Sequence, residues 1–320
     1  MQSSRIPPLL DRVLSIPHQD SLILLTSVLG ATTNWLIVRY LYSCLASHQP
    51  SLSRHNPGDD HPPLKVVLVT WLRDAEFWKT EVKRAVGIDL ARLAVQGRFA
   101  FIDAITAVAY QPRPLGTSLV ASSKGKSHFL SSPDPNHLEE VVLAALGPEK
   151  PSKDDNQGGN VVLILDAPDF LLAASDPGAD GRMDLKLLQA IHRIRQHPSI
   201  RSTIVAAQTD SPLMVAPNHT THTLTNLAGQ NASPLEIAHT SFLTQLAQLA
   251  SIRISLRMLD TGAAGDVSGV GRVTYGKPFT ADTAGQEDGV AHPEASEWLY
   301  FVAVDGSAKA WERGSGTSVG

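Results

Sequence analysis

Residues 21–34 read Ser-Leu-Ile-Leu-Leu-Thr-Ser-Val-Leu-Gly-Ala-Thr-Thr-Asn, an apolar run followed by a short, more polar turn. The run is apolar at successive positions, which is typical of a strand covered by helices on both faces. Residues 34–47 then carry Arg39, Ser43 and Ser47 four residues apart on an otherwise apolar surface, as in a helix packed on a sheet. A strand, a turn and a helix in this order predict an α/β fold.

Similar apolar runs recur along the chain, with helical patterns between them. The runs occupy residues 66–69, 99–102, 161–165, 203–207 and 252–256, and helical patterns include residues 136–146 and 184–197. This alternation predicts a mostly parallel sheet flanked by helices. Residues 271–275 and 298–311 instead alternate, with a hairpin turn at residues 304–307, and predict C-terminal antiparallel strands that extend the sheet.

The domain organisation follows from length and from the polar connections. We expect residues 1–320 to form a single domain, in which residues 1–20 are an N-terminal extension. Long polar connections, expected to be disordered or interaction loops, occupy residues 48–63, 111–130, 147–160, 211–234 and 280–293.

Composition excludes several classes of protein. Hydrophobic residues make up 42% of the chain and charged residues 18%, which allows a large buried core. A net charge of -4 argues against a broad basic face that wraps nucleic acid, and a single cysteine excludes an intrachain disulfide or a cysteine-based zinc site. Residues 21–38 are uncharged, but polar residues interrupt them and Asp11 and Asp20 precede them, so we expect no membrane anchor.

The turn after the first apolar run lies where many nucleotide hydrolases carry their phosphate-binding loop. That loop requires Gly, four variable residues, Gly, Lys and then Ser or Thr, so that amides and the lysine surround the phosphates. Here Ser27 and Thr32 stand at the glycine positions, Thr33 at the lysine position and Asn34 at the hydroxyl position, with Gly30 inside the turn. Loss of the lysine alone costs on the order of 3 kcal/mol. We therefore expect no cofactor and no ATP hydrolysis. The alternative interpretation, a simple turn between a strand and a helix, predicts the same inactivity.

Two later strand ends carry polar residues at related positions. Asp166 follows the apolar run 161–165. Nucleotide hydrolases carry the magnesium-binding aspartate of their second motif after a similar apolar strand, although strands in many other proteins also end in Asp. The next predicted strand ends at Gln208, where RecA-like proteins place a polar residue that senses nucleotide. Asp74 and Asp103 also follow apolar runs and are interpreted as helix caps or turn residues. The order of these strand ends along the chain and the spacing between them together favour a RecA-like scaffold.

The chain resembles the sixth subunit of the Elongator complex, in a fungal type of sequence. The segments that carry the resemblance are residues 3–10, 21–31, 34–36, 71–74, 77–78 and 97–103. The resemblance implies a non-catalytic RecA-like subunit, present in the cytoplasm and nucleus, that joins the fourth and fifth subunits in a hetero-hexameric ring. It also implies tRNA binding and support for wobble-uridine modification by the catalytic Elongator subunits.

Two other functions stay open at this point. One is an ATPase subunit whose pocket is completed by a neighbour, although a neighbour cannot supply a missing loop. The other is a recombination-type accessory protein that acts on DNA.

RecA-like rings present two loops to the central pore, and these are the expected places for nucleic-acid contacts. The first is expected at residues 172–183, where Arg182 is the one basic residue and a possible tRNA contact. The second, residues 211–234, has no Lys or Arg. A basic loop carries Arg113, Lys124, Lys126 and His128, but is interpreted as a surface segment.

Overall fold

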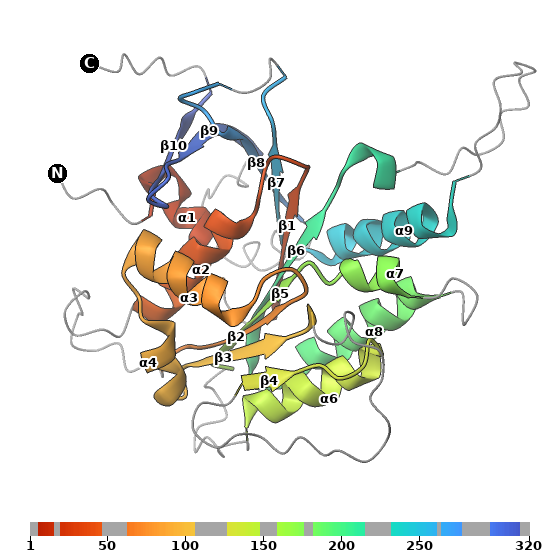
Figure 1. The fold of residues 1–320 in the computed structure, drawn as a ribbon. Helices are drawn as coiled ribbons and strands as arrows, with labels where there is room; N and C mark the ends of the chain where they lie inside the picture. Colours follow the sequence, from red (N-terminus) through yellow and green to blue (C-terminus); the bar gives the residue numbers. More distant parts are fainter. Residues whose placement is uncertain are drawn as a thin grey trace, which may run out of the picture.

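The computed structural model describes residues 6–15, 20–46, 63–105, 127–147, 159–175, 182–214, 232–260, 264–276 and 295–313. Their strands form one ten-stranded sheet in the order β10-β9-β8-β7-β1-β6-β5-β2-β3-β4 (Figure 1). The parallel strands are β1 (Ser21–Ser27), β2 (Lys65–Thr70), β3 (Phe99–Asp103), β4 (Ser127–Phe129), β5 (Val161–Asp166), β6 (Ile200–Gln208) and β7 (Ile252–Arg257). The predicted mostly parallel sheet is confirmed.

Helices cover both faces of this sheet (Figure 1). One face is covered by α1 (Asp11–Leu14), α2 (Asn34–Ala46), α3 (Ala75–Val86) and α4 (Leu90–Val95), and the other by α6 (Pro135–Leu146), α7 (Phe170–Ala174), α8 (Met183–Arg195) and α9 (Pro234–Leu249). Side chains alternate between two hydrophobic clusters along β1, because Ile23 and Leu25 pack beneath α2 while Leu22 and Leu24 pack on the α8 and α9 side. This explains why the strand is apolar at successive positions.

The two aspartates interpreted as caps or turn residues do serve in this way. Asp74 is the N-cap of α3, and its carboxylate accepts the main-chain N–H of Phe77 at 2.8 Å. The carboxylate of Asp103 accepts the N–H of Ile105 at 2.9 Å in the turn after β3. Both side chains therefore bind their own local backbone.

Two of the predicted loops contain regular structure. Residues 127–129, expected in the loop 111–130, form β4 and pair with β3 at the sheet edge. A strand of three residues is too short to show a pattern in sequence. Within 211–234, residues 211–213 form the 3-10 turn η2 (Ser211–Leu213) and Pro234 begins α9. Apart from their ends, the other predicted loops lie outside the described residues.

The segment before β1 also packs on the fold. It contains the 3-10 turn η1 (Pro8–Leu10) and α1, and the side chains of Leu10 and Leu14 are fully buried. The hydroxyl of Tyr40 in α2 donates a hydrogen bond to the carbonyl of Val13 at 2.9 Å. No helix in the described ranges is long and apolar enough to cross a membrane, and residues 21–38 are divided between β1 and α2.

Three antiparallel strands, here called the C-terminal ribbon, extend the sheet beyond β7 as predicted. They are β8 (Gly269–Tyr275), β9 (Ser296–Val302) and β10 (Ala308–Glu312). Trp298 and Tyr300 of β9 are buried and pack around Trp35 at the start of α2. β9 ends at Val302, and Val304 is 92% exposed in the turn that follows.

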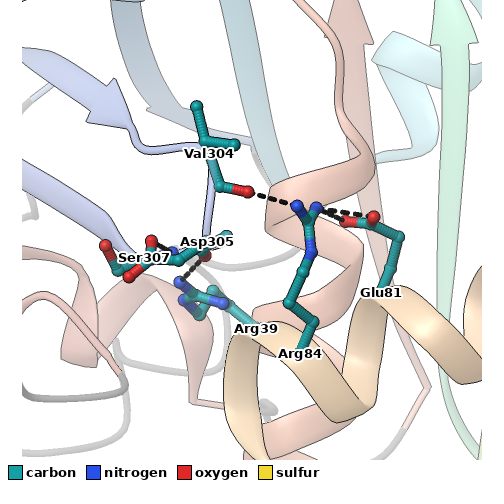
Figure 2. Close-up of polar contacts among 7 residues, drawn as sticks. Arg39, Glu81, Arg84, Val304, Asp305 and Ser307 are labelled. Carbon is teal, nitrogen blue, oxygen red and sulfur yellow. Dashed lines mark hydrogen bonds and ion pairs between the residues drawn. The ribbon is translucent and has the colours of Figure 1, made fainter.

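Two arginines attach the turn of the ribbon to α2 and α3 (Figure 2). The buried Arg39 of α2 donates a hydrogen bond to the carbonyl of Gly306 at 2.7 Å. Arg84 of α3 donates to the carbonyl of Val304 and also pairs with Glu81. Gly306 has a φ of +80°, a left-handed conformation that favours glycine in such turns.

Candidate functional site

The carboxyl ends of the central strands bring the predicted nucleotide-site residues to one edge of the sheet. Ser27 ends β1, Gln208 ends β6, Asp166 ends β5 and Thr70 ends β2. In the registers of these pairs, Ser27 lies opposite Gln208 and Thr70 opposite Asp166. The predicted residues therefore lie at the edge where ligands of open α/β sheets bind, outside the carboxyl ends of the strands.

The turn after β1 is held against the end of β6. The buried Ser27 hydroxyl donates to the Gln208 side-chain oxygen at 3.4 Å, and the Ser27 carbonyl accepts the N–H of Thr209 at 2.7 Å. Gly30 has a φ of +89°, and a Cβ there would lie 3.0 Å from the sulfur of Met258. Met258 therefore restricts the space around the one glycine that remains in this turn.

A carboxylate binds a main-chain amide of this turn. The N–H of Leu29 donates to Oδ1 of Asp210 at 2.6 Å, and Asp210 follows β6 two residues after Gln208. In a phosphate-binding loop such amides point at the phosphates. Here the amide is already bound to a negative charge, which would also repel an entering phosphate.

The lysine position and the second glycine position are likewise occupied by residues that hydrogen-bond to the local backbone. The Thr33 side chain is buried, and its carbonyl accepts the N–H of Leu36 at 2.9 Å at the start of α2. The Thr32 hydroxyl accepts the N–H of Asn34 at 3.2 Å. Neither threonine carries the positive charge that a terminal phosphate needs from lysine.

Asp166 lies deep in the edge and is bound by its neighbouring strand. Its side chain is 3% exposed, and the Thr70 hydroxyl donates to its Oδ2 at 2.7 Å. The pKa of Asp166 is raised to about 6, because the effects of burial and of nearby Asp169 together outweigh those of the Thr70 hydrogen bond and Arg73, which lower it. The Thr70 hydroxyl and Arg73 therefore favour the ionised form of the Asp166 carboxylate.

A buried Asp169–His239 pair adjoins this site and was not predicted from the sequence. Asp169 Oδ2 accepts the main-chain N–H of Gln208 at 3.2 Å and lies 3.3 Å from Nε2 of His239 on α9. Both side chains are at least nine-tenths buried. The pair ties the turn after β5 to the end of β6 and to α9. The two residues are 70 positions apart, so no local pattern could have indicated their contact.

The structure pairs the possible tRNA contact Arg182 with an acid. Its Nε lies 3.5 Å from Oδ1 of the buried Asp184, and its side chain is 63% exposed just before α8. Contrary to the prediction of a pore loop from residue 172, Leu172 lies within α7, because it packs into the hydrophobic cluster on that face. Much of that loop lies outside the described residues, as do most of the second pore loop and Arg113, Lys124 and Lys126 of the basic loop. His128 lies in β4.

Within the described ranges, no group of three or more His, Cys, Asp or Glu side chains is arranged to hold a metal ion.

The fold was compared with known proteins. No family model matches the chain, and no curated protein matches it either. Among solved structures, it is similar to a KaiC-like protein from the archaeon Pyrococcus horikoshii OT3, with a TM-score of 0.50, 12% identity and 97% of both chains covered. It is also similar to an uncharacterised Pyrococcus horikoshii protein in complex with an unknown peptide, with a TM-score of 0.51, 10% identity, and 98% of this chain and 100% of that chain covered.

These similarities, together with the strand order, define the fold of the chain. The chain has a RecA-like α/β fold, with a mostly parallel sheet, flanking helices and antiparallel C-terminal strands. Its solved structural relatives include a KaiC-like protein. At 10–12% identity these likenesses establish the fold alone.

Proposed function

We propose that this chain is a non-catalytic RecA-like subunit of the Elongator accessory ring. In this proposal it assembles with the fourth and fifth Elongator subunits into a hetero-hexamer, binds tRNA within that ring and supports wobble-uridine modification by the catalytic subunits. The residues that support the assignment are those of the resemblance, above all segments 21–31, 34–36 and 71–74.

The hydrogen bond between Leu29 and Asp210 carries the non-catalytic part of this proposal. A hydrolase needs free amides and a lysine around the β- and γ-phosphates, because phosphoryl transfer depends on positioning and on stabilising negative charge. In this chain an amide of the turn is bound to a carboxylate, and a buried threonine stands at the lysine position. Both features oppose nucleotide binding.

Retention of the scaffold supports a role in assembly. The strands, the turn after β1 and the end of β6 are joined by hydrogen bonds, although the residues for phosphate chemistry are missing. A fold that is retained without its catalytic residues can still function through the surfaces that it presents to other molecules. Subunit contacts and tRNA handling are functions that such surfaces provide.

An ATPase assay on the chain alone and on the chain assembled with its two proposed partners tests the non-catalytic role. We expect no turnover in either sample that depends on this chain, and Thr33→Lys alone should not create it because the glycines are also missing. ATP turnover that increases in proportion to the amount of this chain, and that Asp166→Ala abolishes, would instead support the alternative of a pocket completed by a neighbour.

Co-purification tests the assignment to Elongator. The tagged chain should retain the fourth and fifth Elongator subunits through gel filtration as one complex of fixed stoichiometry. A chain that recovers neither subunit and binds duplex DNA in preference to tRNA would contradict the proposal and favour the recombination-type alternative.

A further inference from the structure

Only one face of the C-terminal ribbon packs on the hydrophobic core. Trp298 and Tyr300 of β9 belong to the cluster beneath α2, and a Cβ added at Gly271 of β8 would collide with the Trp298 ring. Because successive residues of a strand face opposite sides of the sheet, the side chains at the alternate positions point away from α2. These side chains form the outward face of the ribbon and include Arg272, Glu297, Leu299, Phe301, Lys309 and Trp311.

Two aromatic rings of the outward face are partly open to solvent. Leu299 of β9 lies opposite Trp311 of β10. Phe301, two residues further along β9, lies opposite Lys309. Residues directly opposite each other in antiparallel strands share a face, so Phe301 and Trp311 are diagonal neighbours. Among the described residues, both rings are partly buried but belong to neither hydrophobic cluster, so they present aromatic surface that the core does not use.

Exposed cations stand on both sides of these rings. Arg272 of β8 lies opposite Glu297 of β9, whereas Lys309 lies opposite Phe301. At a rise of about 3.4 Å per residue, the two cations are separated by roughly 13 Å along the strands, with Trp311 at an intermediate position. Arg272 and Lys309 are exposed, and neither side chain has a polar partner in the described part of the chain.

The acids close to the outward face are already paired with other arginines. Glu297 pairs with Arg313 at 2.9 Å, and Asp260, which follows β7, pairs with Arg257 at 2.8 Å. The charges of the two flanking cations are therefore not balanced by these acids. Although the whole chain has a net charge of -4, the described part of this face has an excess of positive charge.

The combination of aromatic rings and flanking cations is complementary to unpaired nucleotides. Unpaired bases stack on aromatic side chains, and the phosphates that join them are bound by nearby cations. Bases within a duplex are already stacked on one another and cannot use such rings. An apolar protein surface would cover Arg272 and Lys309 without supplying an anion, which is unfavourable.

We propose that the outward face of the ribbon binds unpaired nucleotides of tRNA, with bases stacked on Phe301 and Trp311 and phosphates bound by Arg272 and Lys309. That tRNA carries these nucleotides rests on the proposed function, whereas the site itself rests on the rings, the cations and their register. The site is separate from the carboxyl edge of β1, β2, β5 and β6, where the phosphate-binding loop is degenerate.

Trp311 provides a spectroscopic test of stacking. The chain has five tryptophans, and the other four, Trp35, Trp71, Trp78 and Trp298, are buried. A base that stacks on Trp311 should quench its fluorescence. We therefore expect a short oligouridylate to quench the emission of the wild-type chain, whereas an RNA duplex of the same length should quench it much less. Trp311→Leu should abolish the quenching, and equal quenching in this variant would overturn the site.

Fluorescence anisotropy of the full chain and of the assembled ring measures the contribution of the rings. Phe301→Leu/Trp311→Leu keeps an apolar surface but removes both rings, and it should melt within a few degrees of wild type because neither residue joins the core. With labelled oligouridylate and with a labelled tRNA transcript, we expect this variant to bind about tenfold or more weakly.

The same titrations measure the contribution of the cations. Arg272→Gln/Lys309→Gln should reduce the slope of log affinity against log salt by about 1.4, because each lost contact with single-stranded RNA contributes about 0.7. Lys83→Gln/Arg92→Gln is the matched control. It removes the same charge from exposed positions of α3 and α4, on the opposite side of the sheet, and should leave binding nearly unchanged.

The outcomes separate the site from the proposed function. Weaker binding of both RNAs by the leucine and glutamine variants, with the control unchanged, supports the site and its tRNA ligand. Oligouridylate binding that depends on the rings, without any tRNA binding by chain or ring, supports the site and contradicts its tRNA ligand. The site is overturned if neither chain nor ring binds oligouridylate, or if a folded leucine variant binds it like wild type. In the latter case, loss of self-association in Leu299→Lys/Phe301→Lys would identify the face as a protein interface instead.

Discussion

The ring of Tyr300 stacks on the ring of Trp35, with centroids 5.0 Å apart and planes at 27°. Trp35 lies in the first turn of α2, directly after the turn that replaces a phosphate-binding loop, whereas Tyr300 belongs to the C-terminal ribbon. Trp298 completes the cluster at 6.0 Å from Trp35 in an edge-to-face arrangement. The ribbon is therefore part of what holds the start of α2 in place.

Removal of the Tyr300 ring should destabilise the whole fold. Tyr300→Ala deletes a buried aromatic ring and its stacking contact with Trp35, and we expect a loss of about 3–5 kcal/mol in the free energy of unfolding. Tyr300→Phe keeps the ring and should cost much less. Urea denaturation followed by tryptophan fluorescence measures both, and equal losses for the two variants would contradict a role for the stacked ring.

The turn of the ribbon gives a matched pair of glycine substitutions. Gly306 and Gly97 both have left-handed φ values, but an added Cβ at Gly306 would lie 2.6 Å from Cβ of Ala85, whereas nothing lies within 4 Å of one at Gly97. Gly97→Ala should cost about 1 kcal/mol from backbone strain alone. Gly306→Ala should cost about 1–3 kcal/mol more, because crowding against α3 is added. Thermal melts that show equal losses would mean that the turn does not pack on α3.

Asp166 should make the stability of the protein depend on pH. Its folded-state pKa of about 6 lies above the ordinary value of 3.8, so the folded state binds this proton more tightly than the unfolded state does. The contribution of Asp166 to stability is therefore greatest below pH 4 and is lost as the pH rises through 6. Asp166→Asn should keep the Thr70 hydrogen bond and gain roughly 2 kcal/mol at pH 7.5 relative to wild type, with little gain at pH 4. Denaturant titrations at both pH values would contradict this if the gain were larger at pH 4.

The outward face of the ribbon should make the isolated chain self-associate. Leu299 and Phe301 alternate with the buried Trp298 and Tyr300 and remain partly exposed, and Trp311 lies opposite Leu299 on β10. Apolar side chains on a sheet face are stabilised when a neighbour covers them. Light scattering of the lone chain at micromolar concentration should show oligomers, which Leu299→Lys/Phe301→Lys should reduce. A monodisperse wild-type monomer would count against an obligate ring subunit.

Much of the fold could be predicted because its signals are local. The apolar runs located β1, β5 and β6, and the residues that end them, Asp166 and Gln208, lie at the expected edge of the sheet. The turn chemistry of residues 304–307 located the hairpin of the ribbon.

The parts that escaped prediction depend on contacts between distant residues or on very short elements. The hydrogen bond from Leu29 to Asp210 joins residues 181 positions apart, and neither residue stands at a defining position of a motif. The sequence predicted a possible tRNA contact at Arg182, which the structure pairs with Asp184.

A tRNA titration of the lone chain and of the ring reconstituted with the fourth and fifth Elongator subunits tests the central claim most directly. With a net charge of -4, one chain can neutralise few phosphates, whereas a ring adds the sites of all its subunits. Anisotropy at two salt concentrations should therefore show weak binding by the chain and at least tenfold tighter binding by the ring, with a steeper salt dependence. Failure of the three proteins to form a ring, or equally tight tRNA binding by the lone chain, would contradict a non-catalytic ring subunit that handles tRNA as part of an assembly.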